Sequence, residues 1–328
     1  MSQKASPHRI TEIVSMNHLE RLLGWDRNKL RELARTAGRH YDPFDRRREA
    51  GHGKWRHIDN PKGELREAQR AIQRRILAHV TLPPHMFGGV KGQSIRDNGQ
   101  IHTHQPMVVT LDIKNCFPSI SDRDVYAVFA GRLGYRSEIP GLLTRLTTFH
   151  HRLPQGAPTS TTLANLALVP LYEEIERIAT ARNLAMSFWV DDIALSGQGA
   201  EHAIGEVIAA IQARGLQVSA KKLVLMPRDV GPQLITEVVT NRGVSAGRAK
   251  LQAIYHEIQD LSAERNTPEH RLRRITGLIN HVEQVKPHQG RRLRRLADNL
   301  LPKAGSTAKR PRTDETRTCR NAKRHRHA

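Results

Sequence analysis

The stretch "FWVDDIALSG", residues 188–197, places Asp191 and Asp192 between two short apolar runs. The runs at 188–190 and 193–196 have the composition of β-strands, so the two acids lie where a hairpin would turn. Adjacent carboxylates repel each other, and burying either one without a partner is unfavourable. Two interpretations therefore compete: an exposed hairpin turn, or a pair of carboxylates that binds a metal ion.

A third acid, Asp112, stands at the end of another apolar segment, "VVTLDIKNCFPSI" (108–120). The segment 107–113 predicts a buried strand. If this strand pairs beside the 188–197 hairpin, Asp112, Asp191 and Asp192 meet at one edge of a sheet. Clustered carboxylates suit Mg²⁺, which prefers hard oxygen ligands. Two such ions would activate an attacking 3′-hydroxyl and stabilise a leaving pyrophosphate, so the pattern predicts metal-dependent phosphoryl transfer.

The charge of the chain favours a polyanionic partner. Its 328 residues contain 53 Lys and Arg against 32 acids, a net charge of +21. Nucleic acid is favoured over a membrane surface, and a basic solvated surface is the alternative. No apolar run approaches the roughly 20 residues that span a bilayer. The N-terminus has no secretory apolar region, and two cysteines build no disulfide framework, so we expect a cytoplasmic protein without a membrane partner.

Helical and strand patterns are mixed along the chain. Helices are expected over 11–37, 65–80, 122–150, 161–182 and 201–214, and a short strand at "KWRHID" (54–59). Two apolar stripes at 272–282 and 293–300, surrounded by arginines, predict a small basic helical domain. The segment 302–328 has nine Lys and Arg, two acids and little apolar content, so we expect it to be disordered.

Between the acids lies "RLPQGAPTSTTLANLAL" (152–168). Gly156 and Pro158 allow a turn that can lie against a flat object, and Gln155 can both donate and accept hydrogen bonds. An ordinary helix start is the alternative interpretation. Its position between Asp112 and the Asp191–Asp192 pair favours a binding loop.

Over roughly residues 50–245 the chain resembles the bacterial retron-type reverse transcriptases and, more distantly, the group II intron enzymes. The three stretches quoted above resemble, in chain order, the first palm motif, the template-and-nucleotide motif and the aromatic-x-Asp-Asp motif. "RHIDNPKGELREAQRAIQRRIL" and "FGGVKGQSIRDNGQIH" resemble finger motifs, and "GLQVSAKKLVL" is similar to the lysine-bearing motif. The resemblance implies a right-hand polymerase of α+β type: an N-terminal helical segment (1–50), fingers and palm with an antiparallel sheet (51–240), a helical thumb (241–301) and a basic tail (302–328).

The resemblance also implies roles for individual residues. The catalytic, metal-binding residues would be Asp112, Asp191 and Asp192, with two Mg²⁺ ions. Phe117 would lie under the sugar of the incoming nucleotide and exclude a 2′-hydroxyl. Further contacts to nucleotide and template would come from Gln155, Gly156, Lys91, Arg96 and Lys222. Lys222 would protonate the leaving pyrophosphate, with Lys221 as its rival.

Asn98-xxx-His102 matches an element typical of retron enzymes, and it is expected to bind RNA together with Arg291, Arg292, Arg294 and Arg295. The resemblance implies an RNA template, a DNA product, a cognate structured RNA, a role in phage defence and an effector protein.

Four residues depart from the family pattern: Thr161, Trp189, Val190, and Glu237, which replaces a usual Gly. Two alternatives stay open. One is a reverse transcriptase of another defence lineage without a retron RNA. The other is an inactive basic RNA-binding protein, against which the intact acids argue.

Overall fold

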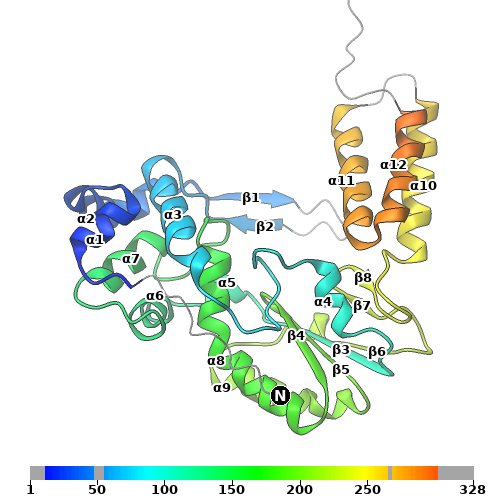
Figure 1. The fold of residues 1–328 in the computed structure, drawn as a ribbon, viewed down its shortest axis with the longest axis horizontal. Helices are drawn as coiled ribbons and strands as arrows, with labels where there is room; N and C mark the ends of the chain where they lie inside the picture. Colours follow the sequence, from blue (N-terminus) through cyan, green and yellow to red (C-terminus); the bar gives the residue numbers. More distant parts are fainter. Residues whose placement is uncertain (1–11, 48–54, 265–267, 302–328) are drawn as a thin grey trace, which may run out of the picture. The chain divides into compact units, whose positions relative to one another are not determined.

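The computed structural model describes residues 12–47, 55–264 and 268–301 (Figure 1). The chain divides into two compact units, each described here by itself. The first contains Met1–Arg248 with Gln284–Lys286, and the second contains Ala249–Glu283 and the chain from Pro287 onward.

A four-stranded antiparallel sheet forms the centre of the first unit. Its strands lie in the order β4 (Ala185–Trp189), β5 (Asp192–Ser196), β3 (Met107–Asp112) and β6 (Val224–Pro227). The expected strand at 107–113 is present, and so is the expected hairpin around Asp191. Helices and an antiparallel sheet occur together, so the predicted α+β class is confirmed.

The two faces of this sheet have different neighbours. Side chains of Leu111, Ile193 and Leu195 belong to the large core, together with the long helix α8 (Ser160–Ala181), which is apolar on most sides. Residues of the opposite face, among them Val108 and Ala194, share a small cluster with Ile235. Because side chains alternate along a strand, residues at even positions of β3 and β5 lie on this second face.

Helices predicted as continuous are interrupted where the backbone requires it. The stretch 11–37 forms α1 (Met16–Leu23) and α2 (Arg27–Thr36), because Gly24 ends α1 in the left-handed conformation with φ 74°. The stretch 122–150 forms α6 (Asp122–Ala127), a π-helical turn (Val128–Arg132) and α7 (Ile139–Thr147), with Gly134 at φ 70° between the last two. Residues of α1 and α2, within the predicted N-terminal helical segment, share the large core with α8.

The shorter elements surround the sheet. The helices are α3 (Gly63–Arg75), α4 (Ile95–Ile101), α5 (Cys116–Ser119) and α9 (Ile204–Ala213). Two small antiparallel hairpins are formed by β1 (Phe44–Arg47) with β2 (Trp55–Ile58), and by β7 (Leu234–Ile235) with β8 (Val238–Val239).

The second unit consists, in its described part, of α10 (Arg248–Ala263), α11 (Glu269–Val285) and α12 (Pro287–Leu300). The helices bury apolar residues of the two predicted stripes, such as Ile275 and Leu293. A Cβ at Gly290 would lie 2.3 Å from the Cα of Glu283, so α11 and α12 approach too closely for any side chain there.

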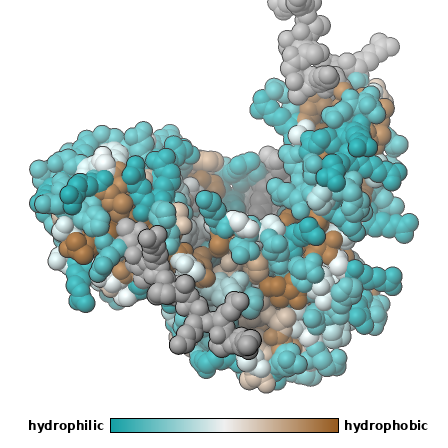
Figure 2. Space-filling model, viewed as in Figure 1, coloured by the Kyte–Doolittle hydropathy of each residue, from teal (hydrophilic) through white to brown (hydrophobic). Residues whose placement is uncertain are grey.

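Polar residues cover most of the visible face of each unit (Figure 2). Among the described residues, the helices are all too short or too polar to cross a bilayer.

Candidate active site

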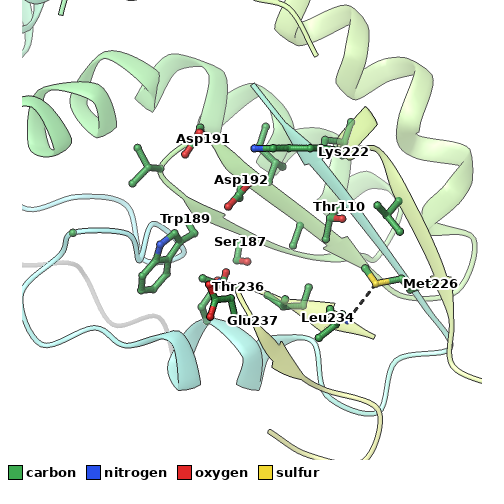
Figure 3. Close-up of a pocket in the computed structure, with 18 of the residues that line it drawn as sticks. Thr110, Ser187, Trp189, Asp191, Asp192, Lys222, Met226, Leu234, Thr236 and Glu237 are labelled. Atoms are coloured by element: carbon green, nitrogen blue, oxygen red, sulfur yellow. Dashed lines mark hydrogen bonds between the residues drawn. The ribbon is translucent and has the colours of Figure 1, made fainter. Parts of the chain in front are cut away.

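The three candidate acids come together at one end of the sheet. Asp112 is the last residue of β3 and is directly paired with Asp192, the first residue of β5. Directly paired residues of antiparallel strands point to the same face, so both carboxylates lie on the face opposite α8. Asp191 is in the turn that joins β4 to β5, beside them (Figure 3). The structure therefore brings together the acids that the sequence places up to 80 residues apart.

The turn that carries Asp191 has an unusual backbone. It contains two residues, Val190 and Asp191, and Val190 has φ 59°. A left-handed first residue is typical of a type II′ hairpin turn, where glycine is normal and a β-branched residue is strained. Val190 is 9% exposed, and a Cβ at Gly88 would lie 2.6 Å from its Cγ2. This close packing holds the turn and so fixes the position of Asp191.

Burial and mutual repulsion act on the acids. Burial, and then the charge of Asp112, raises the pKa of Asp191. The Asp192 side chain reaches solvent, yet surrounding protein atoms and then the charges of Asp191 and Asp112 raise its pKa as well. Lys222 offsets part of this charge, because its ammonium group donates to Asp112 Oδ2. The site is therefore an electronegative cluster that favours a cation.

The donor set fits a magnesium site, although the side chains are not yet arranged as one. In the described part of the chain, no three His, Cys, Asp or Glu side chains form a ready metal-binding group. The Lys222 ammonium group holds Asp112, which is 5% exposed. Carboxylate oxygens are the ligands that Mg²⁺ prefers, and a cation would offset the burial and mutual repulsion that raise the pKa of Asp191 and of Asp192. Metal binding would therefore require Asp112 to exchange Lys222 for the ion.

A pocket of about 860 Å³ lies over Asp191 and Asp192. Its lining includes Asp191, Asp192, Phe117 and Lys222 from the predicted set, and also Lys221. The volume is in the range of pockets that bind small ligands. Phe117 is half-buried in α5, packed against the core on one side and open to the pocket on the other.

The Gln155–Gly156 loop is bound to the end of β2. Asp59 N donates to the Gln155 carbonyl (2.9 Å), and Gln155 N donates to Asp59 Oδ2 (3.1 Å). Gly156 has φ 118°, and a Cβ there would lie 2.8 Å from Ile58 Cγ2, so this position requires glycine. In the amide orientation that satisfies its neighbours, Gln155 accepts from Arg56 Nε (2.5 Å) and Nη2 (2.6 Å). Strand β2 therefore positions the loop.

Arg56 is a site residue that sequence reasoning missed. It lines the pocket, and its positive charge offsets part of the rise in the pKa of Asp191. In the sequence it stands in the predicted strand "KWRHID" with nothing to separate it from the other arginines of this basic chain. Only the pairing of β2 with the Gln155 loop reveals it.

Two other predicted nucleotide contacts lie elsewhere. Lys91, in the loop before α4, and Arg96, in α4, are exposed. Neither is among the described residues that line the pocket. Their contact with the triphosphate stays a prediction.

Asn98 and His102 are buried, with exposed fractions of 1% and 0%. Asn98 Nδ2 donates to Thr236 Oγ1 (2.7 Å). The His102 ring joins two strands: Nδ1 bonds with Ser196 Oγ (2.7 Å) and Nε2 with Ser187 Oγ (2.8 Å). The RNA contact predicted for His102 is not compatible with this position, because a fully buried ring cannot reach RNA. For Asn98 the described bond is internal.

Burial of His102 predicts a pH-dependent stability. Burial, and then the nearby His85, lowers the pKa of His102 from 6.5 to about 3. Below pH 6.5 His102 is therefore protonated in the unfolded chain but stays neutral in the folded chain. The free energy of unfolding consequently decreases as the pH falls from about 6.5 towards 3. At pH 5 the loss is about 2 kcal/mol. We expect His102→Gln to flatten this dependence, measured by urea unfolding at pH 7.5 and pH 5. The exposed His202→Gln is the control, and equal slopes in the two variants would contradict the assignment.

The arginines of α12 differ in their contacts. Arg291, Arg292 and Arg295 are exposed, with no acidic partner among the described residues. Arg294 is half-buried and donates to Glu283 Oε2 (2.7 Å) and Asn280 Oδ1 (2.6 Å). Three of the four predicted RNA-binding arginines are thus available on the surface of the helix, and the fourth is held in an internal network.

The fold and the site together define a nucleotidyltransferase-like arrangement, and comparison with known proteins identifies its class. A family model described as reverse transcriptase (RNA-dependent DNA polymerase) matches residues 47–244. The retron Ec86 reverse transcriptase of Escherichia coli is 28% identical over 279 residues, 84% of this chain and 86% of that protein. The retron Se72 reverse transcriptase of Salmonella heidelberg is 29% identical over 187 residues, 57% of this chain and 49% of that protein. The retron Mx65 reverse transcriptase of Myxococcus xanthus is 27% identical over 281 residues, 78% of this chain and 64% of that protein.

The chain therefore belongs to the reverse transcriptases, the RNA-directed DNA polymerases, and within them it is of retron type. The predicted family and enzyme class are confirmed. The alternative of an inactive RNA-binding protein is not favoured.

Proposed function

We propose that the chain adds deoxynucleotides to a primer on an RNA template in the 860 Å³ pocket of the first unit. The observation that carries this proposal is the meeting of Asp112, Asp191 and Asp192 at one end of the sheet, with raised pKa values for the last two. These carboxylates would hold two Mg²⁺ ions. Bound there, the ions would lower the pKa of the primer 3′-hydroxyl and neutralise the leaving pyrophosphate.

Residues of the pocket lining and of the adjoining Gln155–Gly156 loop would position and select the nucleotide. The Phe117 ring would lie under the sugar and leave no space for a 2′-hydroxyl. Gln155 and Gly156 would contact the nucleotide and template, with Arg56 adding positive charge for phosphate. Lys222 is the candidate for protonating pyrophosphate once it leaves Asp112, and Lys221 on the same pocket lining is its rival.

We also propose the right-hand division of the chain. Residues 51–240 would form the fingers and palm, with Lys91 and Arg96 reaching the triphosphate from the fingers. The helices within 241–301 would form the thumb, which the separate three-helix unit supports. The basic segment 302–328 lies outside the described residues, and we propose that it neutralises phosphates.

The template is proposed to be a cognate structured RNA, and the biological role to be phage defence with an effector protein. The relatives named as retron reverse transcriptases support this reading. Sequencing the nucleic acid that co-purifies with the protein is the discriminating experiment. One recurrent structured RNA joined to DNA would support the proposal, and an unselected mixture would favour a lineage without a retron RNA.

Primer extension tests the activity itself. The full-length protein is supplied with an RNA template, an annealed primer and dNTPs, with Mg²⁺ or with an excess of EDTA. We expect extension with Mg²⁺ and none with EDTA, because the three acids alone cannot neutralise a phosphoryl group. Extension that persists in EDTA would contradict the metal assignment.

The α12 arginines should bind RNA. Replacing Arg291, Arg292 and Arg295 with Gln should weaken binding of the co-purified RNA and make log affinity less steep against log salt by about 2 to 3 units, since each phosphate contact contributes nearly one unit. The matched control replaces Arg271, Arg273 and Arg274, which form ion pairs with Glu264, Glu269 and Glu257. It removes the same charge but should change the slope less. Equal slopes for the two triple variants would mean that the α12 arginines contact phosphates no more than the ion-paired arginines do, and that only the total charge matters for RNA binding.

A further inference from the structure

Helix α4 joins two parts of the catalytic pocket through buried contacts. His102, just after the helix, bonds with Ser187 of β4 and Ser196 of β5, the strands on either side of Asp191 and Asp192. Asn98, one turn earlier, donates to Thr236 Oγ1 in the turn of the β7–β8 hairpin (2.7 Å). A short helix therefore holds both hairpins.

The β7–β8 hairpin touches α4 closely. A Cβ at Gly99 would lie 2.6 Å from Val238 Cγ2, so no other residue fits there without a shift. Ile235 and Val238, on either side of the turn, are 1% and 0% exposed. These contacts press the hairpin onto the helix and leave its turn at the pocket.

The turn itself has a backbone that its residues disfavour. Thr236 has φ 44° and Glu237 has φ 70°. Two consecutive left-handed residues define a type I′ turn, in which Asn-Gly is usual and a β-branched residue such as threonine is rare. Strained backbone of this kind persists where surrounding contacts hold it, and it concentrates at functional sites. The Asn98–Thr236 hydrogen bond is one side-chain contact that holds this turn.

The turn forms a wall of the pocket. Thr236 and Glu237 line the same pocket as Asp191 and Asp192, and Figure 3 shows them below Asp192. Asn98 lines the pocket too, and its Oδ1 is buried without a hydrogen-bond partner among the described residues.

We propose that Asn98 is a positioning residue for DNA synthesis: its bond to Thr236 holds the left-handed Thr236–Glu237 turn at the pocket, and this turn sets where the primer end lies relative to Asp191 and Asp192. The inference rests on the proposed function, since it takes this pocket as the place of nucleotide addition. It replaces the RNA contact expected for Asn98 with an internal role. A displacement of about 1 Å at the reacting atoms costs about two orders of magnitude in rate, so a small relaxation of the turn is sufficient to be measured.

The test is a double-mutant cycle in primer extension by the full-length protein. The variants are Asn98→Ala, Thr236→Val and the double variant; thermal unfolding is measured for each. We expect each single variant to lower kcat/KM for primer–template about tenfold or more, with the KM for dNTP changed less than twofold. The double variant should be no worse than the more damaged single variant, because both remove one bond. Thr236→Ser, which keeps the hydroxyl group, should retain activity.

The control is Thr103→Val. It removes a hydroxyl group just after the same helix, where Thr103 Oγ1 donates to the Gln100 carbonyl (3.0 Å) and accepts from Gln100 Nε2 (3.5 Å), and it should leave kcat/KM unchanged. If the variant Asn98→Ala does not fold because this residue is buried, Thr236→Val still tests the hydrogen bond, since valine has nearly the same shape as threonine and the position is partly exposed. Variants that unfold at lower temperature but keep wild-type kcat/KM would overturn the inference and leave a structural bond. Wild-type protein that shows no synthesis, or synthesis that Asp191→Asn leaves intact, would overturn the proposed function instead.

Discussion

Asp191→Asn is expected to abolish DNA synthesis, lowering kcat by at least about a thousandfold, which corresponds to about 4 kcal/mol. The amide keeps the shape of the side chain but loses the charge that would bind metal. The turn should remain, because Val190 and its packing against Gly88 hold the backbone. Primer extension with Mg²⁺, measured in single turnover, checks the result.

The fold should survive this substitution. Burial and the charge of Asp112 already raise the pKa of Asp191, so removing one acid relieves repulsion within the cluster. We expect a thermal midpoint no lower than that of the wild type. Asp229→Asn is the matched control, since this acid is 96% exposed. Near wild-type synthesis by Asp191→Asn would disprove the metal-site assignment.

Phe117→Ala is expected to admit ribonucleotides. The ring lines the pocket, and the barrier we propose is its volume alone. The ratio of rNTP to dNTP efficiencies should rise about 10- to 200-fold, the range that one steric contact in a pocket supplies. The measurement is kcat/KM for matched rNTP and dNTP on the same RNA template.

Phe117→Tyr is the control for volume, because it keeps the ring and should keep the discrimination. Phe117 also packs against the core, so the folded fraction of each variant must be compared. An unchanged ratio in a folded, active Phe117→Ala variant would mean that the ring is core packing and that another residue excludes the 2′-hydroxyl.

The sequence predicts well that the three acids meet at one end of the sheet, because the pattern is local. Apolar runs flank Asp191 and Asp192 and precede Asp112, so the acids fall at or beside strand ends, and the pairing of β3 with β5 brings them together. Motif order then identifies the family. Helix boundaries were less accurate, since single glycines such as Gly24 and Gly134 end or interrupt helices that periodicity alone would continue.

Long-range pairing explains what the sequence could not predict. Arg56 enters the site because β2 bonds with the Gln155 loop, about 100 residues further along the chain. His102 was expected at the RNA because Asn98-xxx-His102 resembles an element of retron enzymes, yet two serines on neighbouring strands bond with both ring nitrogens inside the protein. The residue types of Arg56 and His102 alone do not indicate whether each side chain lines the pocket or is buried inside the protein.

The central sheet has a core face and a pocket face, so substitutions at neighbouring residues of one strand should have two different effects. Along β5, Ile193 and Leu195 are fully buried in the large core, whereas Asp192 and Ala194 line the pocket. Substitutions at Ile193 or Leu195 should reduce the amount of protein that accumulates, whereas substitutions at the exposed Asp192 should yield abundant protein with impaired synthesis. A loss of activity in a mutant library can therefore be assigned from the position within β5, by comparing the protein level with the rate of synthesis.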